Sequence, residues 1–269
     1  MSDSQNFSTS KQKEVKKTML SGLIKLAEKL QVSSFHVTFP CKEEWEMFGQ
    51  NGLLKRTDRQ FHWINDGFDT FEDFLSTLSS RKRKGIRKER RTVLENNIVV
   101  HFLTGEKIKR HHWNSFFSFY QNTADKKWGQ AYLNRNFFLQ IGKNLGKNLL
   151  LVMAEKDGRF VGGALNLIGK DALFGRYWGC LEDFKFLHFE ICYYRAMDFA
   201  IKNGLRRVEA GAQGHHKLQR GYLPNPTYSA HWIANDAFKR AIAHYLEEET
   251  KAINDEIKNL NEYSPFKKI

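Results

Sequence analysis

The chain has 269 residues, of which 41% are hydrophobic and 14% aromatic, so it can bury a real core and is not disordered throughout. Its formal net charge of +13 points to anionic partners: nucleic acid, phosphorylated metabolites or a membrane surface. No apolar run approaches the ~18 residues of a membrane span, and the polar first residues lack the apolar core of a signal peptide. Three cysteines without CxxC spacing favour a cytoplasmic protein.

The first third of the chain predicts a leader and a small α/β segment. Residues 1–14 are polar and are expected to be a disordered leader, and helical spacing of apolar residues from Val15 to Leu30 then predicts a helix. The remaining elements are a strand at 34–39, a short helix at 43–48 and a second strand at 59–65. Residues 15–66 are therefore interpreted as a partial first lobe.

Residues 67–97 predict one long basic helix that links two lobes. Phe71, Phe74 and Leu78 begin its apolar face, and the helix is expected to run to about Glu95. Between Ser79 and Arg91, eight of thirteen residues are Lys or Arg. Such a run is either a solvated linker or a surface for phosphate groups.

From Ile98 the predicted order of elements becomes regular: β-α-α-β-β-β-α-β-(short α)-β, which forms a complete lobe over residues 98–236. The Asp157-Gly158 turn between two alternating apolar runs is typical of a β-hairpin. Residues 237–269 follow as a C-terminal helix. The predicted elements are strands at 98–102, 149–155, 160–168, 172–180, 205–210 and 227–233 and helices at 108–122, 134–143 and 188–203.

The chain also contains an internal repeat of helix, strand, short helix and strand. Residues 15–66 parallel residues 189–236, and the pairs His62-Trp63 and His231-Trp232 fall at matching places in the two copies. Residues 15–66 would then be the back half of a lobe whose front half is missing.

Several blocks of sequence are specific enough to indicate a family. They are Arg176-Tyr-Trp-Gly-Cys, His188-Phe-Glu190 and Gly211-Ala-Gln-Gly214, within a match that covers roughly residues 34–266. In these blocks the chain resembles the FemAB-like family of peptidoglycan biosynthesis or recognition, within the GNAT acyltransferase superfamily. The resemblance implies an α/β fold with a GNAT-like mixed sheet flanked by helices, here one complete lobe plus an N-terminally truncated second lobe. It also implies transfer of an acyl or aminoacyl group to an amine of a peptidoglycan-type precursor.

The chain departs from the family pattern at one position of its glycine-rich motif. Where the family usually has Gly-Glu-His-Lys, this chain has Gly214-His215-His216-Lys217, so His215 replaces an acid. If that acid is a catalytic base or an amine anchor, the chain is a binding module that has lost activity. The alternatives are therefore an enzyme and a non-catalytic binder.

Three residues are candidates for moving protons. Acyl transfer needs a neutral amine and hence a base, and Glu190 and His188 lie at the start of the helix that in GNAT proteins adjoins the donor. Tyr222 is a candidate proton donor to a leaving hydroxyl. The plainer interpretation of Glu190 is a first-turn acid that complements the helix dipole.

The glycine-rich motif and its surroundings supply the candidate substrate-binding residues. Lys217 and Arg220 are three residues apart, so they share one face of a short helix and are expected to hold a phosphate or carboxylate. The plainer alternative is a polar turn. The full set of candidates is Arg176, Tyr177, Gln213, Gly214, His216, Lys217, Arg220, His231 and Trp232.

The basic helix is a candidate for contacts with tRNA phosphates, which would make binding salt-dependent. A polybasic helix of this kind also suits an anionic membrane. The candidate contact residues are Arg81, Lys82, Arg83, Lys84, Arg87, Lys88, Arg90 and Arg91.

The donor is expected to be aminoacyl-tRNA, with acyl-CoA as the alternative and no tightly bound cofactor. Acetyl-CoA enzymes of the superfamily bind pyrophosphate with Arg/Gln-x-x-Gly-x-Gly/Ala, and the segment from Arg176 to Leu181 matches it incompletely. No metal is expected, because the adjacent His215 and His216 have no helical HxxxH or CxxC partner.

Overall fold

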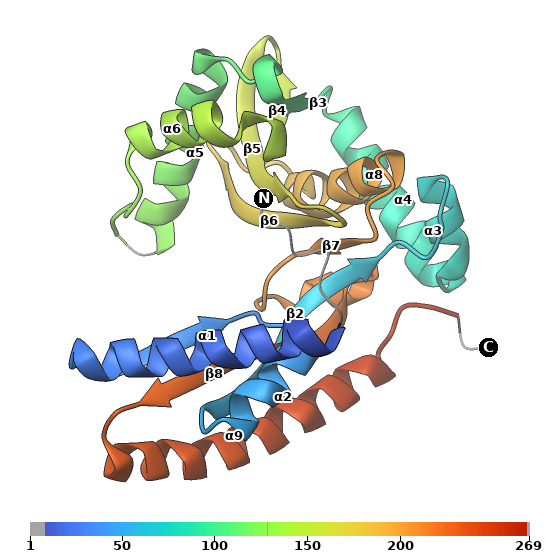
Figure 1. Ribbon diagram of the computed structural model, residues 1–269. Helices are drawn as coiled ribbons and strands as arrows, with labels where there is room; N and C mark the ends of the chain where they lie inside the picture. The colour runs from blue at the N-terminus through green and yellow to red at the C-terminus, as the bar shows by residue number, and fades with distance from the viewer. Residues whose placement is uncertain (1–8, 128, 268–269) are drawn as a thin grey trace. The chain divides into compact units, whose positions relative to one another are not determined.

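The computed structural model describes residues 9–127 and 129–267, which divide into two compact units (Figure 1). Unit 1 contains the described residues up to Arg59 together with Asn225–Asn259, and unit 2 contains the described residues of Gln60–Pro224 and those from Leu260 onward. Of the predicted disordered leader, residues 1–8 lie outside the described part. Residues 9–14 are helical, because Lys, Gln and Glu are good helix formers.

Unit 1 is a small α/β layer. Its core joins Leu20, Trp45, Leu53 and Ala230, and β1 pairs antiparallel with β8, with Ser34 opposite Ile233. Its elements are α1 (Thr9–Lys29), β1 (Ser34–Thr38), α2 (Lys42–Gln50), the first part of β2 (Leu54–Ile64), most of β8 (Leu223–Ile233) and most of α9 (Asp236–Glu262).

Unit 2 holds the larger sheet, in the order β2-β7-β6-β5-β4-β3. The pairs are antiparallel except for β6 and β7, which are parallel. The strands are the end of β2, β3 (Val99–Thr104), β4 (Leu149–Lys156), β5 (Arg159–Ile168), β6 (Ala172–Cys180) and β7 (Arg207–Glu209). The helices are α3 (Phe71–Thr77), α4 (Ser80–Glu95), α5 (Arg110–Lys127), α6 (Arg135–Leu145), α7 (Leu187–Phe189), the π-helix η3 (Glu190–Tyr194), α8 (Arg195–Lys202) and the short 3-10 helices η1 (Gly105–Lys107), η2 (Gly146–Asn148) and η4 (His215–Arg220).

Strand β4 shows how the sequence builds two hydrophobic layers. Successive side chains of a strand point to opposite faces. Leu149, Leu151 and Met153 pack with α5 and α6, whereas Leu150 and Val152 join the cluster that includes α8. Figure 1 shows α5 and α6 on one side of the sheet and α8 on the other. The predicted mixed sheet flanked by helices is therefore confirmed.

The predicted order of elements from Ile98 is confirmed, but the single helix expected over residues 71–95 is wrong. Leu78 adopts an extended conformation between α3 and α4 and forms a bridge with Phe266, while the Ser79 N–H donates to the Pro265 carbonyl. The C-terminal segment therefore interrupts the helix. Helix α4 contributes Ile86 and Val93 to the core of unit 2.

The strand registers support the internal repeat. In unit 2, His62 and Ile64 of β2 pair with Glu209 and Arg207 of β7. In unit 1, His231 and Ile233 of β8 pair with His36 and Ser34 of β1 in the same antiparallel sense. Each copy of the repeat thus contributes its second strand to pair with the first strand of the other copy, which we call the reciprocal strand exchange.

Gly179 in β6 is a position where any side chain is expected to destabilise the fold. A Cβ there would lie 2.2 Å from the Phe119 carbonyl oxygen, so α5 and β6 would have to separate. We expect Gly179→Ala to lower the free energy of unfolding by about 2–3 kcal/mol. Gly85 in α4 is the matched control, because a Cβ there meets nothing within 4 Å; Gly85→Ala should raise stability by about 0.5–1 kcal/mol. Equal urea midpoints for the two variants would contradict the predicted clash.

Candidate functional site

The candidate site of unit 2 lies where β6 and β7 part. The two strands pair only from Ala172 to Phe174, after which β6 continues to Cys180 while the chain leaves β7 at Ala210. A register shift at Leu165/Asn166 makes Arg176 the extra residue of a β-bulge. The divergence opens a cavity of about 460 Å³, which lies within the usual size range of small-molecule sites.

The cavity is lined by residues of α5, β5, β6, the helical segment over residues 187–202 and the segment that follows β7. Among the described residues that line it, none is Asp or Glu. Seven predicted site residues come together there: Arg176, Tyr177, His188, Gln213, Gly214, His216 and Lys217. The other lining residues are Tyr120, Thr123, Ala164, Leu165, Asn166, Gly175, Trp178, Cys192, Tyr193 and Ala210.

His216 has the geometry and electrostatics of a neutral base. Its Nε2 atom lies 2.9 Å from the Tyr193 hydroxyl. Burial, followed by the charges of Arg220 and Lys217, holds the pKa of His216 below its usual value of 6.5, so the imidazole is neutral at pH 7. Burial raises the pKa of Tyr193, so its phenol stays protonated. The pair can pass a proton within the cavity.

Gly214 shapes the loop that carries His216. Its φ of +95° is a backbone conformation that glycine adopts readily. A Cβ at this position would lie 2.5 Å from the His216 imidazole. The glycine therefore lets the loop turn and lets the imidazole pack against it.

His188 also lines the cavity, at the first turn of the helical segment over residues 187–202. Its imidazole packs 5.1 Å from the Trp178 ring and 5.3 Å from the Tyr193 ring, measured between centroids. His188 and His216 are themselves 5.7 Å apart by the same measure. The two histidines thus share one aromatic wall of the site.

Glu190, the other predicted base, does not line the cavity. Its side chain is 3% exposed and forms an ion pair with Arg195 at 2.7 Å and with Arg90 at 3.2 Å. Burial raises the pKa of Glu190, while the two arginines oppose that shift. The carboxylate therefore joins α4 to the π-helix η3, and the structure gives it no access to a substrate.

Tyr222 and Arg220 are likewise internal. Tyr222 is fully buried, its hydroxyl donates to the Tyr193 carbonyl, and burial raises its pKa well above 10. Arg220 is 7% exposed and makes a bidentate ion pair with Glu89, with Nη2–Oε1 at 2.6 Å and Nε–Oε2 at 3.1 Å. Contact with a substrate was predicted for both residues, but the structure buries both side chains away from the cavity lining.

Lys217 lines the cavity, but its ammonium group forms hydrogen bonds with the backbone. Its ammonium donates to the carbonyl oxygens of Ala210 and Gly211, and its side chain is buried. Lys217 therefore holds the loop that follows β7, a role that the sequence did not predict.

His231 and Trp232 belong to unit 1 and not to the residues that line the cavity. His231 Nδ1 lies 2.8 Å from His36 Nδ1 on the paired strand. Trp232 stacks on Phe35 with centroids 5.5 Å apart. Both side chains make cross-strand contacts within the β1–β8 pair.

Comparison with known proteins identifies the family. The FemAB-like family, described as peptidoglycan biosynthesis/recognition, matches residues 5–268. The chain belongs to the FemAB-like family. A search among curated proteins finds no significant match.

Solved structures show the same fold at low sequence identity. The FemAB-like chain superposes on FemX with a TM-score of 0.63 and 11% identity, covering 86% of this chain and 79% of FemX. The C-terminal domain of a putative lysylphosphatidylglycerol synthetase from Agrobacterium fabrum superposes with a TM-score of 0.61 and 9% identity, covering 85% of this chain and 76% of that domain. L-PGS from Bacillus licheniformis superposes with a TM-score of 0.60 and 10% identity, covering 84% of this chain and 77% of L-PGS. At such identities these similarities establish the fold alone.

The cationic side chains of α4, the basic helix of this FemAB-like protein, differ in their exposure and in their ion-pair partners. Arg90 points inward to Asp198, at 2.6 Å, and Glu190, while Arg87 forms a surface pair with Glu72 at 2.5 Å. Lys82 and Arg83 are half-buried. Four exposed cations remain at spacings of three and four residues and form one face, the outer face of α4: Arg81, Lys84, Lys88 and Arg91.

Some lining residues were missed by the sequence interpretation. Asn166 is 2% exposed within the otherwise apolar run from Phe160 to Ile168, and this lone polar residue was a usable signal. The sequence gives no comparable indication for Tyr193, because it lies in an aromatic and apolar segment whose residues are expected to be core. Among the described residues, no group of three His, Cys, Asp or Glu side chains lies in reach of one metal ion.

Among the residues that the structure describes, no helix combines the length and apolar composition that crossing a bilayer requires. All three cysteines are free thiols.

Proposed function

We propose that this FemAB-like protein is an N-acyltransferase that moves an aminoacyl group from aminoacyl-tRNA to an amine of a peptidoglycan-type precursor. The observation that carries the proposal is the contact of His216 with Tyr193 in a cavity that has no Asp or Glu among its described lining residues; burial lowers the pKa of His216, which favours the neutral base. Family membership supports the transferase class and the type of acceptor. The free thiols fit a reducing compartment such as the cytoplasm.

The chemistry follows from the groups present. The neutral amine attacks the ester carbonyl, a C–N bond forms and the ester C–O bond breaks. His216 accepts the proton of the amine, and the departing hydroxyl oxygen takes a proton from the His216–Tyr193 pair. Backbone N–H groups of β6 beyond Phe174, where its pairing with β7 has ended, stabilise the oxyanion.

The charge of the cavity favours a neutral nucleophile and an anionic substrate group. Nearby positive charge lowers the pKa of a bound amine, and no carboxylate among the described lining residues opposes this shift, so the site favours the unprotonated form. Arg176 is exposed at the bulge, with its guanidinium 5.7 Å from the Tyr177 ring. We assign to Arg176 the binding of the substrate's carboxylate or phosphate, the role that was predicted for Lys217 and Arg220.

The donor assignment depends on the outer face of α4. Four exposed cations on one helix face suit a phosphate backbone. The named product of one structural neighbour, lysylphosphatidylglycerol, carries a lysyl group. Both observations favour an aminoacyl donor, and the incomplete pyrophosphate signature between Arg176 and Leu181 weakens the case for acyl-CoA.

A titration of labelled tRNA at several salt concentrations tests the donor. The variant carries Arg81→Glu, Lys84→Glu, Lys88→Glu and Arg91→Glu. The matched control reverses four exposed cations elsewhere in unit 2: Lys107→Glu, Arg110→Glu, Lys143→Glu and Lys147→Glu. We expect only the first variant to flatten the log–log salt slope, by up to about 0.7 per lost phosphate contact. Equal weak binding by all three proteins would eliminate the tRNA donor and direct the search to CoA thioesters.

A non-catalytic binding role is the second candidate, and it rests on His215. That residue replaces the acid of the family motif, but it is exposed and does not line the cavity. A gain of turnover in His215→Glu would support a decayed enzyme, whereas turnover by the unmodified chain would dismiss the binding role.

A further inference from the structure

Helix α1 has two apolar faces, and only one of them joins the core. Leu20 and Ala27 are each 4% exposed, and Leu20 packs with Ile24 in the core of unit 1. The second face is 40–69% exposed. We call it the outer stripe, and its members are Val15, Met19, Leu23, Leu26 and Leu30.

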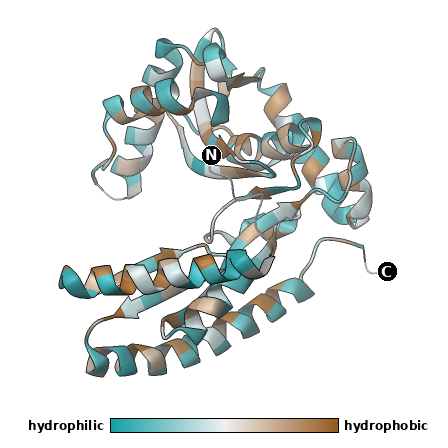
Figure 2. Cartoon of the chain, viewed as in Figure 1, coloured by the Kyte–Doolittle hydropathy of each residue, from teal (hydrophilic) through white to brown (hydrophobic). Residues whose placement is uncertain are grey.

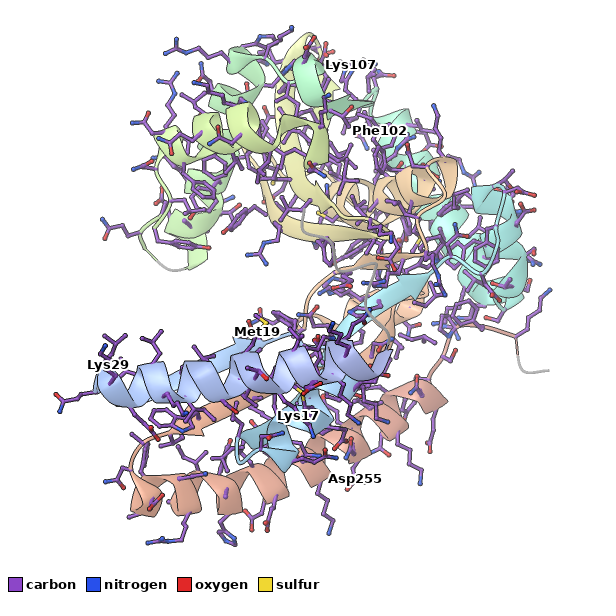
Figure 3. The ribbon with its side chains drawn as sticks, in the orientation of Figure 1. Lys17, Met19, Lys29, Phe102, Lys107 and Asp255 are labelled. Atoms are coloured by element: carbon purple, nitrogen blue, oxygen red, sulfur yellow. The ribbon has the colours of Figure 1, made fainter. Side chains whose placement is uncertain are left out.

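The outer stripe is continuous along the helix. Its spacings of four, four, three and four residues keep its members within about 80° of the helix circumference and over roughly 22 Å of its length. Leu30 extends the helix through its N–H bond to the Leu26 carbonyl. Figure 2 shows hydrophobic residues recurring along α1, and Figure 3 shows Met19 and Lys17 projecting from different sides of it. Single exposed apolar residues are ordinary, but a contiguous patch marks a contact surface.

The charges of α1 indicate what covers this stripe. The helix contains six lysines and two glutamates. Lys25 and Lys29 are exposed and border one side of the stripe, and Lys16, bound to Glu44 at 2.7 Å, borders the other. Lysine side chains can lay their methylenes along an apolar surface while the ammonium reaches outward. An apolar stripe bordered by lysines is typical of helices that lie in the interface of an anionic bilayer.

A second copy of the chain fits this surface less well. Met19, Leu23, Leu26 and Leu30 follow a heptad pattern, but they span fewer than the three to four heptads typical of a coiled coil. Bringing two such helices together would also bring their lysines close, which opposes association.

We propose that α1 docks the protein onto an anionic lipid bilayer. The outer stripe lies at the boundary between headgroups and acyl chains, and the bordering lysines contact lipid phosphates. This inference concerns unit 1 and stands independently of the proposed transferase reaction.

Vesicle co-sedimentation of the full chain tests the proposal. The probes are vesicles of mixed phosphatidylglycerol and phosphatidylcholine, and vesicles of phosphatidylcholine alone. We expect the unmodified chain to bind the anionic vesicles and Met19→Asp/Leu26→Asp to bind them at least about tenfold more weakly. Lys25→Glu/Lys29→Glu should also bind more weakly.

Ser21→Asp is the matched control, because Ser21 is exposed on the same helix but away from the stripe; it should bind nearly as the unmodified chain does. Far-UV circular dichroism and urea unfolding should be alike for all variants, because the changed side chains are exposed. The proposal is overturned if the unmodified chain ignores anionic vesicles, or if Met19→Asp/Leu26→Asp binds them equally well. Light scattering that shows a dimer dissociated by Met19→Asp/Leu26→Asp, without vesicle binding, would make the stripe an interface between copies instead.

Discussion

Replacement of His216 by glutamine is expected to lower kcat/KM by about 10²–10⁴-fold, the usual contribution of a general base. Glutamine can keep a hydrogen bond to the Tyr193 hydroxyl, which lies 2.9 Å from His216 Nε2, but it cannot accept the proton of the amine. The measurement is the rate of aminoacyl transfer in a purified system. His244→Gln, an exposed histidine of α9, is the control and should be without effect.

The pH dependence of the transfer rate is a second test of His216 as the base. A base must be unprotonated, and burial together with Arg220 and Lys217 holds the pKa of His216 below 6.5. The rate should therefore be constant near pH 7 and fall as the pH drops through that lowered pKa. His216→Gln should lose this acid limb. A variant that keeps both the rate and the limb would exclude His216 as the base and return attention to His188, which lines the same cavity.

Arg220→Ala is expected to lower the free energy of unfolding by about 3–5 kcal/mol, because it removes a buried guanidinium and leaves its partner Glu89, whose side chain is 18% exposed, without its countercharge. Arg220 also donates to the His216 carbonyl at 2.7 Å and lies over the Phe189 ring at 3.4 Å, so several contacts are lost together. Urea unfolding measures the change. The double variant Arg220→Ala/Glu89→Ala should cost less than the sum of the single changes, since the two side chains interact.

Arg176→Ala provides the matched comparison for Arg220. Arg176 is exposed at the bulge of β6, so its loss should change the free energy of unfolding by less than about 0.5 kcal/mol while raising KM. The opposite pattern, a stable Arg220→Ala protein with a raised KM, would restore Arg220 as a substrate ligand, as the sequence predicted.

From Ile98 onward, local patterns were sufficient to predict the order of helices and strands, but they did not show which charged side chains would be paired. Alternation and helical spacing are properties of neighbouring residues, so strands such as β4 and β5 were predictable from a short window. Arg220 pairs with Glu89, 131 positions away, and Arg90 pairs with Asp198, 108 positions away. Which cations stay available to a ligand is decided by these distant partners, and a run of basic residues does not reveal them.

The break between α3 and α4 has the same origin. The apolar spacing of Phe74 and Leu78 continues a helical pattern, but the flanking Ser and Thr residues are weak helix formers, and Phe266 and Pro265 pair with the backbone there. Within the glycine-rich motif to which the family resemblance pointed, Gln213, Gly214 and His216 line the cavity. Glu190 does not line the cavity and pairs with Arg90 and Arg195 instead, a placement that its position at the start of a helix does not reveal.

The reciprocal strand exchange bears on how such a chain arises and folds. An ancestor with one copy of the repeat would exchange this strand between two identical chains, as a domain-swapped dimer does. Joining two copies in one chain makes the exchange intramolecular, so its stability no longer depends on protein concentration. It also makes the two copies depend on each other, since without its counterpart β7 would lose β2 and β1 would lose β8. We therefore expect the two copies of the repeat to fold together.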